Sequence, residues 1–288
     1  MLSLKGLGVA LVTPFNNDKS VDFHSLGKLL DHIKNHIDYL IVFGTTSETP
    51  TLFEDEKKDI LNLVRSKVNV PIVLGMGGYN TGEIIKKLLK QDFEGVEAIL
   101  SVTPYYNKPN QRGLIEHFTA IADASPVPVV LYNVPPRTAV NIEAETTLQL
   151  ATHKNIIAIK EASGDFGQIM EIVKNKPESF TVVSGDDGIT LPLISIGVTG
   201  LISVIANAYP KLTHDLVWSA LNGDFAKAKD IHYKLLPVIK AIFSDGNPAG
   251  IKALLSAMGI IKNNLRLPLV PVKNELMAEM EKIVAELK

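Results

Sequence analysis

The fold is indicated most clearly by Ile156-Ile157-Ala158-Ile159-Lys160-Glu161, in which four apolar residues run directly into a lysine. The apolar run is too short for a helix and has the length of a buried strand. A buried ammonium group is costly, and a lysine in a low-dielectric site loses its proton more easily than one in water. Lys160 is therefore either a candidate amine nucleophile or, more simply, a strand-end residue whose side chain lies in solvent.

Short apolar runs of this kind recur along the chain, and segments with a helical period separate them. The eight runs are Leu7–Val12, Tyr39–Phe43, Val70–Leu74, Ala98–Val102, Val127–Tyr132, Ile156–Ile159, Phe180–Val183 and Gly200–Val204. The helical segments include Phe23–Lys34, Glu54–Val68, Thr81–Gln91, Gly113–Ala124, Ala144–Thr152 and Phe166–Lys174. Strands that are apolar on both faces and alternate with helices predict a parallel sheet covered by helices. Eight such units in about 200 residues favour a closed (β/α)8 TIM barrel of the α/β class over an open sheet.

Only helical patterns follow the eighth run. We predict helices over Pro210–Leu221, Phe225–Phe243, Pro248–Met258 and Asn274–Leu287. No linker rich in serine or glycine separates them from the rest of the chain. The predicted organisation is therefore a catalytic barrel over residues 1–224 and a C-terminal helical extension over residues 225–288.

The composition is that of an ordinary globular chain, with 288 residues, of which 46% are hydrophobic and 21% are charged. A net charge of −2 argues against nucleic acids and anionic membranes as partners. The absence of cysteine excludes disulfides, thiolate metal sites and cysteine nucleophiles. No apolar run approaches the ~18 residues of a membrane span. Because Leu7–Val12 lacks the flanking residues of a signal peptide, we expect a cytoplasmic protein.

Polar side chains that can do chemistry stand at the predicted strand ends, where barrel enzymes place their active sites. They occur in Thr13-Pro14-Phe15, Gly44-Thr45-Thr46-Ser47-Glu48, Thr103-Pro104-Tyr105-Tyr106-Asn107, Tyr132-Asn133 with Arg137-Thr138 beyond, Lys160-Glu161 and Ser184-Gly185-Asp186-Asp187. Closure of the barrel would bring these groups to one rim. This convergence favours the catalytic interpretation of Lys160. A metal site is not predicted, because His32 and His36 lack the HExxH context and the other histidines are scattered.

Lys160 and Tyr132 form the central predicted pair. An unprotonated lysine amine can form an imine with a ketone, and loss of an α-proton then gives an enamine. Tyr132, at the end of the neighbouring strand, could move protons or could simply hydrogen-bond to backbone. Thr45 and Thr46 suit a small carboxylate but would look the same as helix-capping residues. Arg137 could bind a second carboxylate or could be a solvated charge.

Five motifs, in this order, resemble the pyruvate-dependent class I aldolases, the family of dihydrodipicolinate synthase and N-acetylneuraminate lyase. They are Gly44-Thr45-Thr46-Ser47-Glu48, Thr103-Pro104-Tyr105-Tyr106-Asn107-Lys108-Pro109, Tyr132-Asn133-Val134-Pro135-Pro136-Arg137-Thr138, Ile159-Lys160-Glu161-Ala162-Ser163-Gly164-Asp165 and Ser184-Gly185-Asp186-Asp187. The likeness continues into Asn247-Pro248 and Leu265-Arg266-Leu267-Pro268-Leu269 and so covers essentially the whole chain. It implies a TIM barrel whose lysine forms a covalent imine with pyruvate, without a cofactor or a metal.

The resemblance also implies a task for each matching residue. Lys160 forms the Schiff base, and Tyr132 is the general acid and base. Thr46, Tyr106 and Tyr132 form a proton relay, in which Tyr106 reaches in from a neighbouring subunit. Thr45 and Thr46 hold the pyruvate carboxylate. The relay implies at least a homodimer, and the family implies a homotetramer built as a dimer of dimers.

Further positions bear on the second substrate. Gly185 and Ile202 line the implied site through their backbone, and Arg137 receives the second carboxylate. Arg137 and the double threonine favour the branch that condenses pyruvate with L-aspartate 4-semialdehyde to 4-hydroxy-tetrahydrodipicolinate, in lysine and diaminopimelate biosynthesis. Sugar-acid lyases of the family commonly lack this arginine. Two alternatives stay open, namely another pyruvate-dependent lyase and a barrel that binds ketoacids without catalysis.

Two departures from the family pattern carry their own expectations. Ser47 stands where the family usually has glycine, which leaves the conformation of this turn open. Some family members are inhibited by lysine at a cleft that includes histidines after the second motif. Glu54 and Lys57 stand at the corresponding positions, and we therefore predict weak or absent feedback inhibition by lysine.

Overall fold

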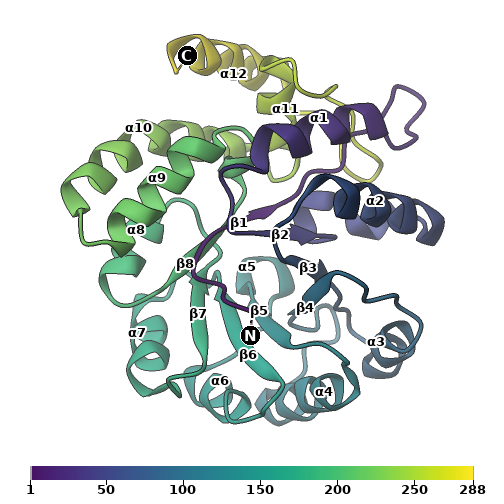
Figure 1. The fold of residues 1–288 in the computed structure, drawn as a ribbon, viewed down its shortest axis with the longest axis vertical. Coiled ribbons are helices and arrows are strands. Elements are labelled where there is room, and N and C mark those ends of the chain that lie inside the picture. Colours follow the sequence, from purple (N-terminus) through teal and green to yellow (C-terminus); the bar gives the residue numbers. More distant parts are fainter. Residues whose placement is uncertain (1, 288) are drawn as a thin grey trace. The chain divides into compact units, whose positions relative to one another are not determined.

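The computed structural model describes residues 2–287 and contains eight strands that hydrogen-bond in chain order in a closed barrel (Figure 1). The strands are β1 (Gly6–Ala10), β2 (Tyr39–Val42), β3 (Ile72–Gly75), β4 (Val96–Val102), β5 (Val129–Asn133), β6 (Ile156–Glu161), β7 (Thr181–Ser184) and β8 (Gly200–Ser203). Each predicted run overlaps one of these strands, and the pairings of β1 with β2 and of β3 through β7 with their successors are parallel. The predicted TIM barrel is therefore confirmed.

Helices alternate with the strands and continue after them. Those between the strands are α1 (Phe23–Ile33), α2 (Glu54–Lys67), α3 (Thr81–Leu88), α4 (Gln111–Ala124), α5 (Pro135–Thr138), α6 (Ala144–Leu150), α7 (Phe166–Asn175) and α8 (Thr190–Ser195). The predicted C-terminal helices are present as α9 (Pro210–Leu221), α10 (Phe225–Ser244), α11 (Ala249–Ala257) and α12 (Asn274–Glu286). Short 3₁₀ turns cover Thr45–Ser47, Thr49–Thr51 and Ile205–Asn207. The expected helical region after the eighth strand is thus also confirmed.

The described chain divides into two units. The first contains the residues up to Gly6 together with Pro71–Ile202, and the second contains Leu7–Val70 together with the residues from Ser203 onward. The predicted domain boundary between residues 224 and 225 stays a prediction. In the part of the chain that the structure describes, no helix is long and apolar enough to cross a membrane.

The first unit is built around a core between strands and helices. Phe118 of α4, Leu131 of β5 and Ile159 of β6 belong to one buried apolar cluster. Figure 1 shows α4, α6 and α7 on the outer side of β5, β6 and β7. Apolar residues on both strand faces are therefore explained by core on one side and helix on the other.

Polar side chains cap the N-termini of α4 and α7 in the first unit. Asn110 and Asp165 accept hydrogen bonds from the backbone N–H of Gly113 and Gln168, both at 3.0 Å, at the starts of α4 and α7. A capping side chain of this type contributes about 1 kcal/mol. The caps fix where each helix leaves the strand before it, and so they help to define the loops after β4 and β6.

The second unit has its own long-range contacts. The Asp38 carboxylate, just before β2, accepts hydrogen bonds from the Leu7 backbone N–H at 2.7 Å and from Trp218 Nε1 at 2.9 Å. Asn207 donates from Nδ2 to the Ala10 carbonyl oxygen at 2.8 Å. These bonds tie the first two strands to α9 and to the turn before it.

A buried histidine in the first unit makes stability depend on pH. His117 of α4 is buried, and its Nδ1 lies 2.8 Å from the Thr81 hydroxyl. Burial lowers its pKa from 6.5 to about 4, so between these values the unfolded chain binds a proton that the folded chain does not. The stability that the folded chain gains by keeping His117 neutral is complete above pH 6.5 and is lost as the pH falls. The free energy of unfolding should therefore fall between about pH 7 and about pH 4.5. In His117→Gln this fall should be smaller by about 2–3 kcal/mol, as measured by urea unfolding at both pH values. An unchanged loss in the variant would contradict this assignment.

Candidate active site

Lys160 and Tyr132 lie together in the first unit. They are register partners on β6 and β5, and both are buried, with exposed fractions of 6% and 7%. Lys160 Nζ lies 4.2 Å from the centroid of the Tyr132 ring, a distance at which an ammonium is attracted to an aromatic face. The interpretation of Lys160 as a solvated strand-end lysine is therefore wrong. The β6 strand continues through Glu161, so the lysine is held inside the ladder.

Gly185 gives the Lys160 side chain its space. A Cβ atom at position 185 would lie 2.7 Å from Lys160 Cε and 2.8 Å from Ala162 Cβ, which is too close for any side chain. The Gly185 backbone N–H donates to the Glu161 carbonyl oxygen at 2.7 Å and continues the ladder. Ile202 is buried in β8 of the same unit. The glycine at position 185 thus leaves the space that the Lys160 side chain and Ala162 Cβ occupy.

Arg137 is carried by a single helical turn. The structure shows the short helix α5 over Pro135–Thr138, with Ala139 left-handed after it. The Arg137 side chain is exposed. The Thr138 hydroxyl donates to the Val140 carbonyl oxygen at 2.9 Å and stabilises the exit of the loop.

A polar network beside Lys160 was not predicted from the sequence. Asn133 and Glu161, the next register partners after Tyr132 and Lys160, are almost fully buried. The Glu161 carboxylate accepts from Asn133 Nδ2 at 3.1 and 3.2 Å, from the Ser163 backbone N–H at 2.8 Å and from Gln168 Nε2 at 3.2 Å. Burial raises the pKa of the Glu161 carboxyl, and these donors act in the opposite direction. The available signal was a carboxylate directly after the lysine of a buried strand.

Tyr106 is not brought to Lys160 by its own chain. Its side chain is 89% exposed, and its backbone is left-handed with φ of 69°. The loop around it is ordered by the edge-on contact of the Tyr79 and Tyr105 rings, whose centroids lie 5.1 Å apart. Asn107 Nδ2 also donates to the Tyr79 carbonyl oxygen at 3.0 Å. The predicted relay role of Tyr106 therefore stays a prediction.

Thr45 and Thr46 lie in the 3₁₀ turn after β2, in the second unit. The Thr45 side chain is exposed, whereas Thr46 is buried and its hydroxyl accepts from Asn247 Nδ2 at 3.1 Å. Ser47 donates from Oγ to the Leu11 carbonyl oxygen at 2.6 Å and accepts from the Phe43 backbone N–H at 3.2 Å. The hydroxyl thus stabilises this turn. Left-handed φ values occur at Phe43 and Glu48 rather than at Ser47, so a glycine is not needed here.

A buried ion pair in the second unit follows the threonine turn. Glu48 and Lys252 are paired with both side chains fully buried. Lys252 Nζ also donates to the Asn264 carbonyl oxygen at 2.8 Å and lies 4.1 Å from the centroid of the Phe15 ring. Burial lowers the pKa of Lys252 to about 8, while the Glu48 carboxylate acts in the opposite direction. The signal that could have revealed this residue is a lone charge in the otherwise uncharged helix α11.

The arrangement within the first unit supports amine chemistry. A buried lysine with a phenol beside it can attack a carbonyl carbon and exchange protons with a nearby acid and base. Among residues 2–287, no group of three or more histidine, aspartate or glutamate side chains is placed to hold a metal ion.

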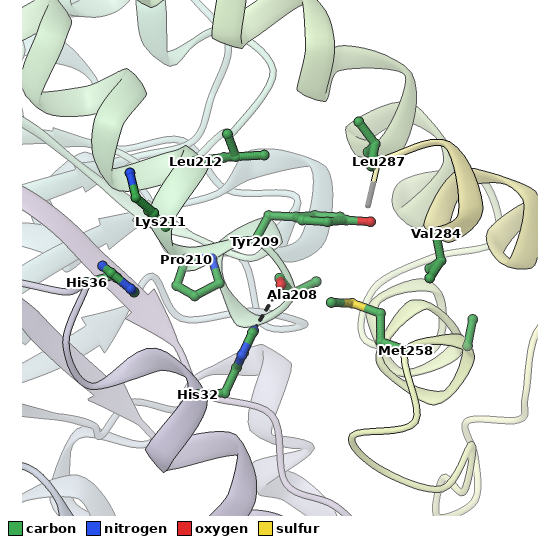
Figure 2. A pocket seen from close by; sticks show the side chains of 11 residues that line it. His32, His36, Ala208, Tyr209, Pro210, Lys211, Leu212, Met258, Val284 and Leu287 are labelled. Atoms are coloured by element: carbon green, nitrogen blue, oxygen red, sulfur yellow. Dashed lines mark hydrogen bonds between the residues drawn. The ribbon is translucent and has the colours of Figure 1, made fainter.

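A cavity of about 410 Å³ in the second unit contains none of the predicted site residues (Figure 2). It is lined by residues of α1, α9, α11 and α12 and their flanks, among them Tyr209, Met258 and Val284. His32 Nε2 lies 3.0 Å from the Ala208 carbonyl oxygen, the contact drawn in Figure 2. Its wall is mostly apolar, and none of the predicted nucleophiles lines it.

Comparison with known proteins assigns the family. Residues 3–287 match the Dihydrodipicolinate synthetase family. The 4-hydroxy-tetrahydrodipicolinate synthase of Parabacteroides distasonis is 52% identical over 290 residues, which cover 99% of this chain and 98% of that protein. The protein of the same name from Phocaeicola vulgatus is 53% identical over 289 residues, covering 99% and 97%. The crystal structure of dihydrodipicolinate synthase from Aquifex aeolicus matches with a TM-score of 0.93 at 37% identity, over 98% of each chain. The resemblance drawn from the five motifs is confirmed.

Proposed function

Because the chain belongs to the dihydrodipicolinate synthetase family, we propose that it is a lyase that condenses pyruvate with L-aspartate 4-semialdehyde to 4-hydroxy-tetrahydrodipicolinate. This reaction serves lysine and diaminopimelate biosynthesis. The observation that carries the proposal is the buried Lys160 amine, 4.2 Å from the centroid of the Tyr132 ring. A buried amine of this kind forms imines without a metal or a bound cofactor.

The reaction begins with attack of the Lys160 nitrogen on C2 of pyruvate. A water molecule leaves and an imine forms, which draws electrons from C3. Tyr132, as acid and base, takes a C3 proton to give the enamine and returns a proton to the new oxygen after the next step. The enamine C3 attacks the aldehyde carbon of the second substrate. The amino group of that substrate then attacks the imine carbon, closes the ring and releases the Lys160 amine.

The remaining roles follow the family resemblance. Thr45 and Thr46 hold the pyruvate carboxylate, which the exposed Thr45 side chain and the Thr46 hydroxyl bound by Asn247 support. Gly185 and Ile202 line the pyruvate site through their backbone. Arg137 receives the carboxylate of the semialdehyde, as its exposed position on the helical turn α5 supports.

The assembly is part of the same proposal. Tyr106 completes the relay of Thr46 and Tyr132 in a neighbouring subunit, in a homotetramer built as a dimer of dimers. The 89% exposure of Tyr106 in an ordered loop supports such a role, because a tyrosine this exposed is available to a partner. Feedback inhibition by lysine is weak or absent. A cytoplasmic location accords with the cysteine-free sequence.

Two measurements test the function. Incubation with pyruvate and borohydride, followed by mass spectrometry, is expected to give one covalent adduct per chain, at Lys160. A substrate panel is expected to give turnover of L-aspartate 4-semialdehyde with pyruvate and none of N-acetylneuraminate. Absence of the adduct would favour a ketoacid-binding barrel, and cleavage of sugar acids would favour another lyase of the family.

Arg137→Ala is expected to weaken the use of the semialdehyde selectively. Loss of a hydrogen-bonded charge corresponds to about 1.5–3 kcal/mol, or about 10- to 150-fold in kcat/KM for that substrate. Pyruvate imine formation should change little, because Arg137 lies outside the Lys160 and Tyr132 pair. Steady-state kinetics with each substrate varied measures both effects. Arg112→Ala, which removes an exposed arginine of α4, is the matched control. Equal loss with both substrates would contradict the assignment.

A further inference from the structure

We propose that Asn133 and Glu161 form a positioning pair that sets where Arg137 stands relative to Lys160, and thereby determines recognition of the second substrate. The inference rests on the proposed function. In this proposal neither Asn133 nor Glu161 contacts a substrate. Both act through the loop that carries Arg137.

The Asn133 side chain closes this loop. Its Oδ1 accepts from the Ile142 backbone N–H at 3.0 Å, and its Nδ2 donates to Asn141 Oδ1 at 2.8 Å. The last residue of β5, from which the loop leaves, is therefore bonded to Ile142 at the end of the loop, nine positions further on. Arg137 lies between them on the α5 turn. Because both ends of the loop are bonded to each other, the part between them, which carries Arg137, has little freedom to move.

Glu161 orients the Asn133 amide. An ionised carboxylate only accepts hydrogen bonds, so the Asn133 NH₂ group must face it. This leaves Asn133 Oδ1 for the Ile142 N–H. Gln168 supports the same arrangement, since its Nε2 donates to Glu161 at 3.2 Å while its Oε1 accepts from Asn141 Nδ2 at 2.7 Å. Each donor in the network has an acceptor, and the direction of every amide is set by Glu161.

The strand register connects the base of the Arg137 loop to the strand that carries the reacting amine of Lys160. Asn133 and Glu161 are partners on β5 and β6, directly after the partners Tyr132 and Lys160. The Ala162 backbone N–H donates to the Asn133 carbonyl oxygen at 2.9 Å. The base of the Arg137 loop is thus bonded to the strand that carries the Schiff-base lysine.

Loss of the amide orientation should affect the two substrates differently. The backbone ladder holds Lys160 and Tyr132, for instance through the Thr103 N–H and the Tyr132 carbonyl oxygen at 3.0 Å. Imine formation with pyruvate should therefore survive a change at Glu161. The position of Arg137 depends on the side-chain hydrogen bonds of Asn133 and Glu161, so a change at Glu161 should impair recognition of the semialdehyde. A merely structural role would impair both substrates together.

The test uses two single variants and their combination in the full-length protein. Glu161→Gln turns one acceptor into a donor, which then faces the Asn133 NH₂ group. Asn133→Asp places a second carboxylate against Glu161. In the double variant, the new aspartate can accept from the Ile142 N–H and from the new glutamine, whose oxygen still accepts from the Ser163 N–H. The net charge of the pair is then the same as in the natural chain.

Asn155→Asp is the matched control, since Asn155 donates to the Ala122 and Ser125 carbonyl oxygens, outside the loop.

The expected result is a substrate-selective loss that the double variant reverses. Each single variant should raise KM for L-aspartate 4-semialdehyde about tenfold or more, with pyruvate KM and the borohydride-trapped adduct changed less than about threefold. The double variant should return to within about threefold of the natural chain, as coupled residues do. Parallel loss for both substrates, or a double variant no better than the singles, would overturn the inference. If the natural chain itself forms no adduct or does not turn over the semialdehyde, the proposed function fails instead.

Discussion

Lys160→Ala is expected to abolish the pyruvate adduct and to lower turnover by more than about 10³-fold, because no other group can form the imine. The fold should persist. Lys160 sits in a ladder made by backbone atoms, and the truncated side chain leaves the Gly185 and Ala162 hydrogen bonds of β6 in place. Mass spectrometry after borohydride treatment measures the adduct, and circular dichroism measures the folded fraction.

A matched variant separates loss of the nucleophile from loss of a lysine in general. Lys174 lies exposed near the end of α7, and Lys174→Ala should leave the adduct and the turnover unchanged. Persistence of a stoichiometric adduct in folded Lys160→Ala protein would place the reacting amine elsewhere and would contradict the proposed mechanism.

Lys252→Met is expected to destabilise the second unit by about 3–5 kcal/mol, because it leaves the Glu48 carboxylate buried without its cation. The Glu48 side chain is fully buried, and its Oε2 accepts from the Arg266 backbone N–H at 3.0 Å. Methionine has nearly the volume of lysine without its charge, so the effect measures the ion pair rather than a cavity. Urea unfolding monitored by circular dichroism gives the change in free energy.

The effect should extend to the threonine turn. The Glu48 backbone N–H donates to the Thr45 carbonyl oxygen at 3.1 Å and closes the turn that holds Thr46. Adding Glu48→Gln to Lys252→Met removes the unpaired charge and should recover part of the stability. Lys211→Met breaks only the pair of the exposed Lys211 with the half-buried Asp215 on α9 and should cost less than about 1 kcal/mol. A loss that small in Lys252→Met would show that the buried pair contributes little.

Local pattern was enough to predict the barrel and its central residue. Every short apolar run became a strand, because strands covered on both sides must be apolar throughout. The lysine after Ile156–Ile159 and the tyrosine at the end of the preceding run, Val127–Tyr132, were found in the same way, as residues with polar groups at the ends of buried strands. The helices after the eighth strand follow from their own 3.6-residue period.

Only the tertiary structure showed how these residues are held. Whether Lys160 lies in solvent or is buried depends on what packs around it, and a single strand carries no such information. Thr46 and Asn247 are 201 positions apart, and Glu48 and Lys252 are 204 positions apart, so no local period relates them. The Asn133 and Glu161 pair arises from the register between two strands. Side-chain partners of this kind are chosen by the folded chain, since hydrogen bonds and buried charges form between residues that the topology brings together.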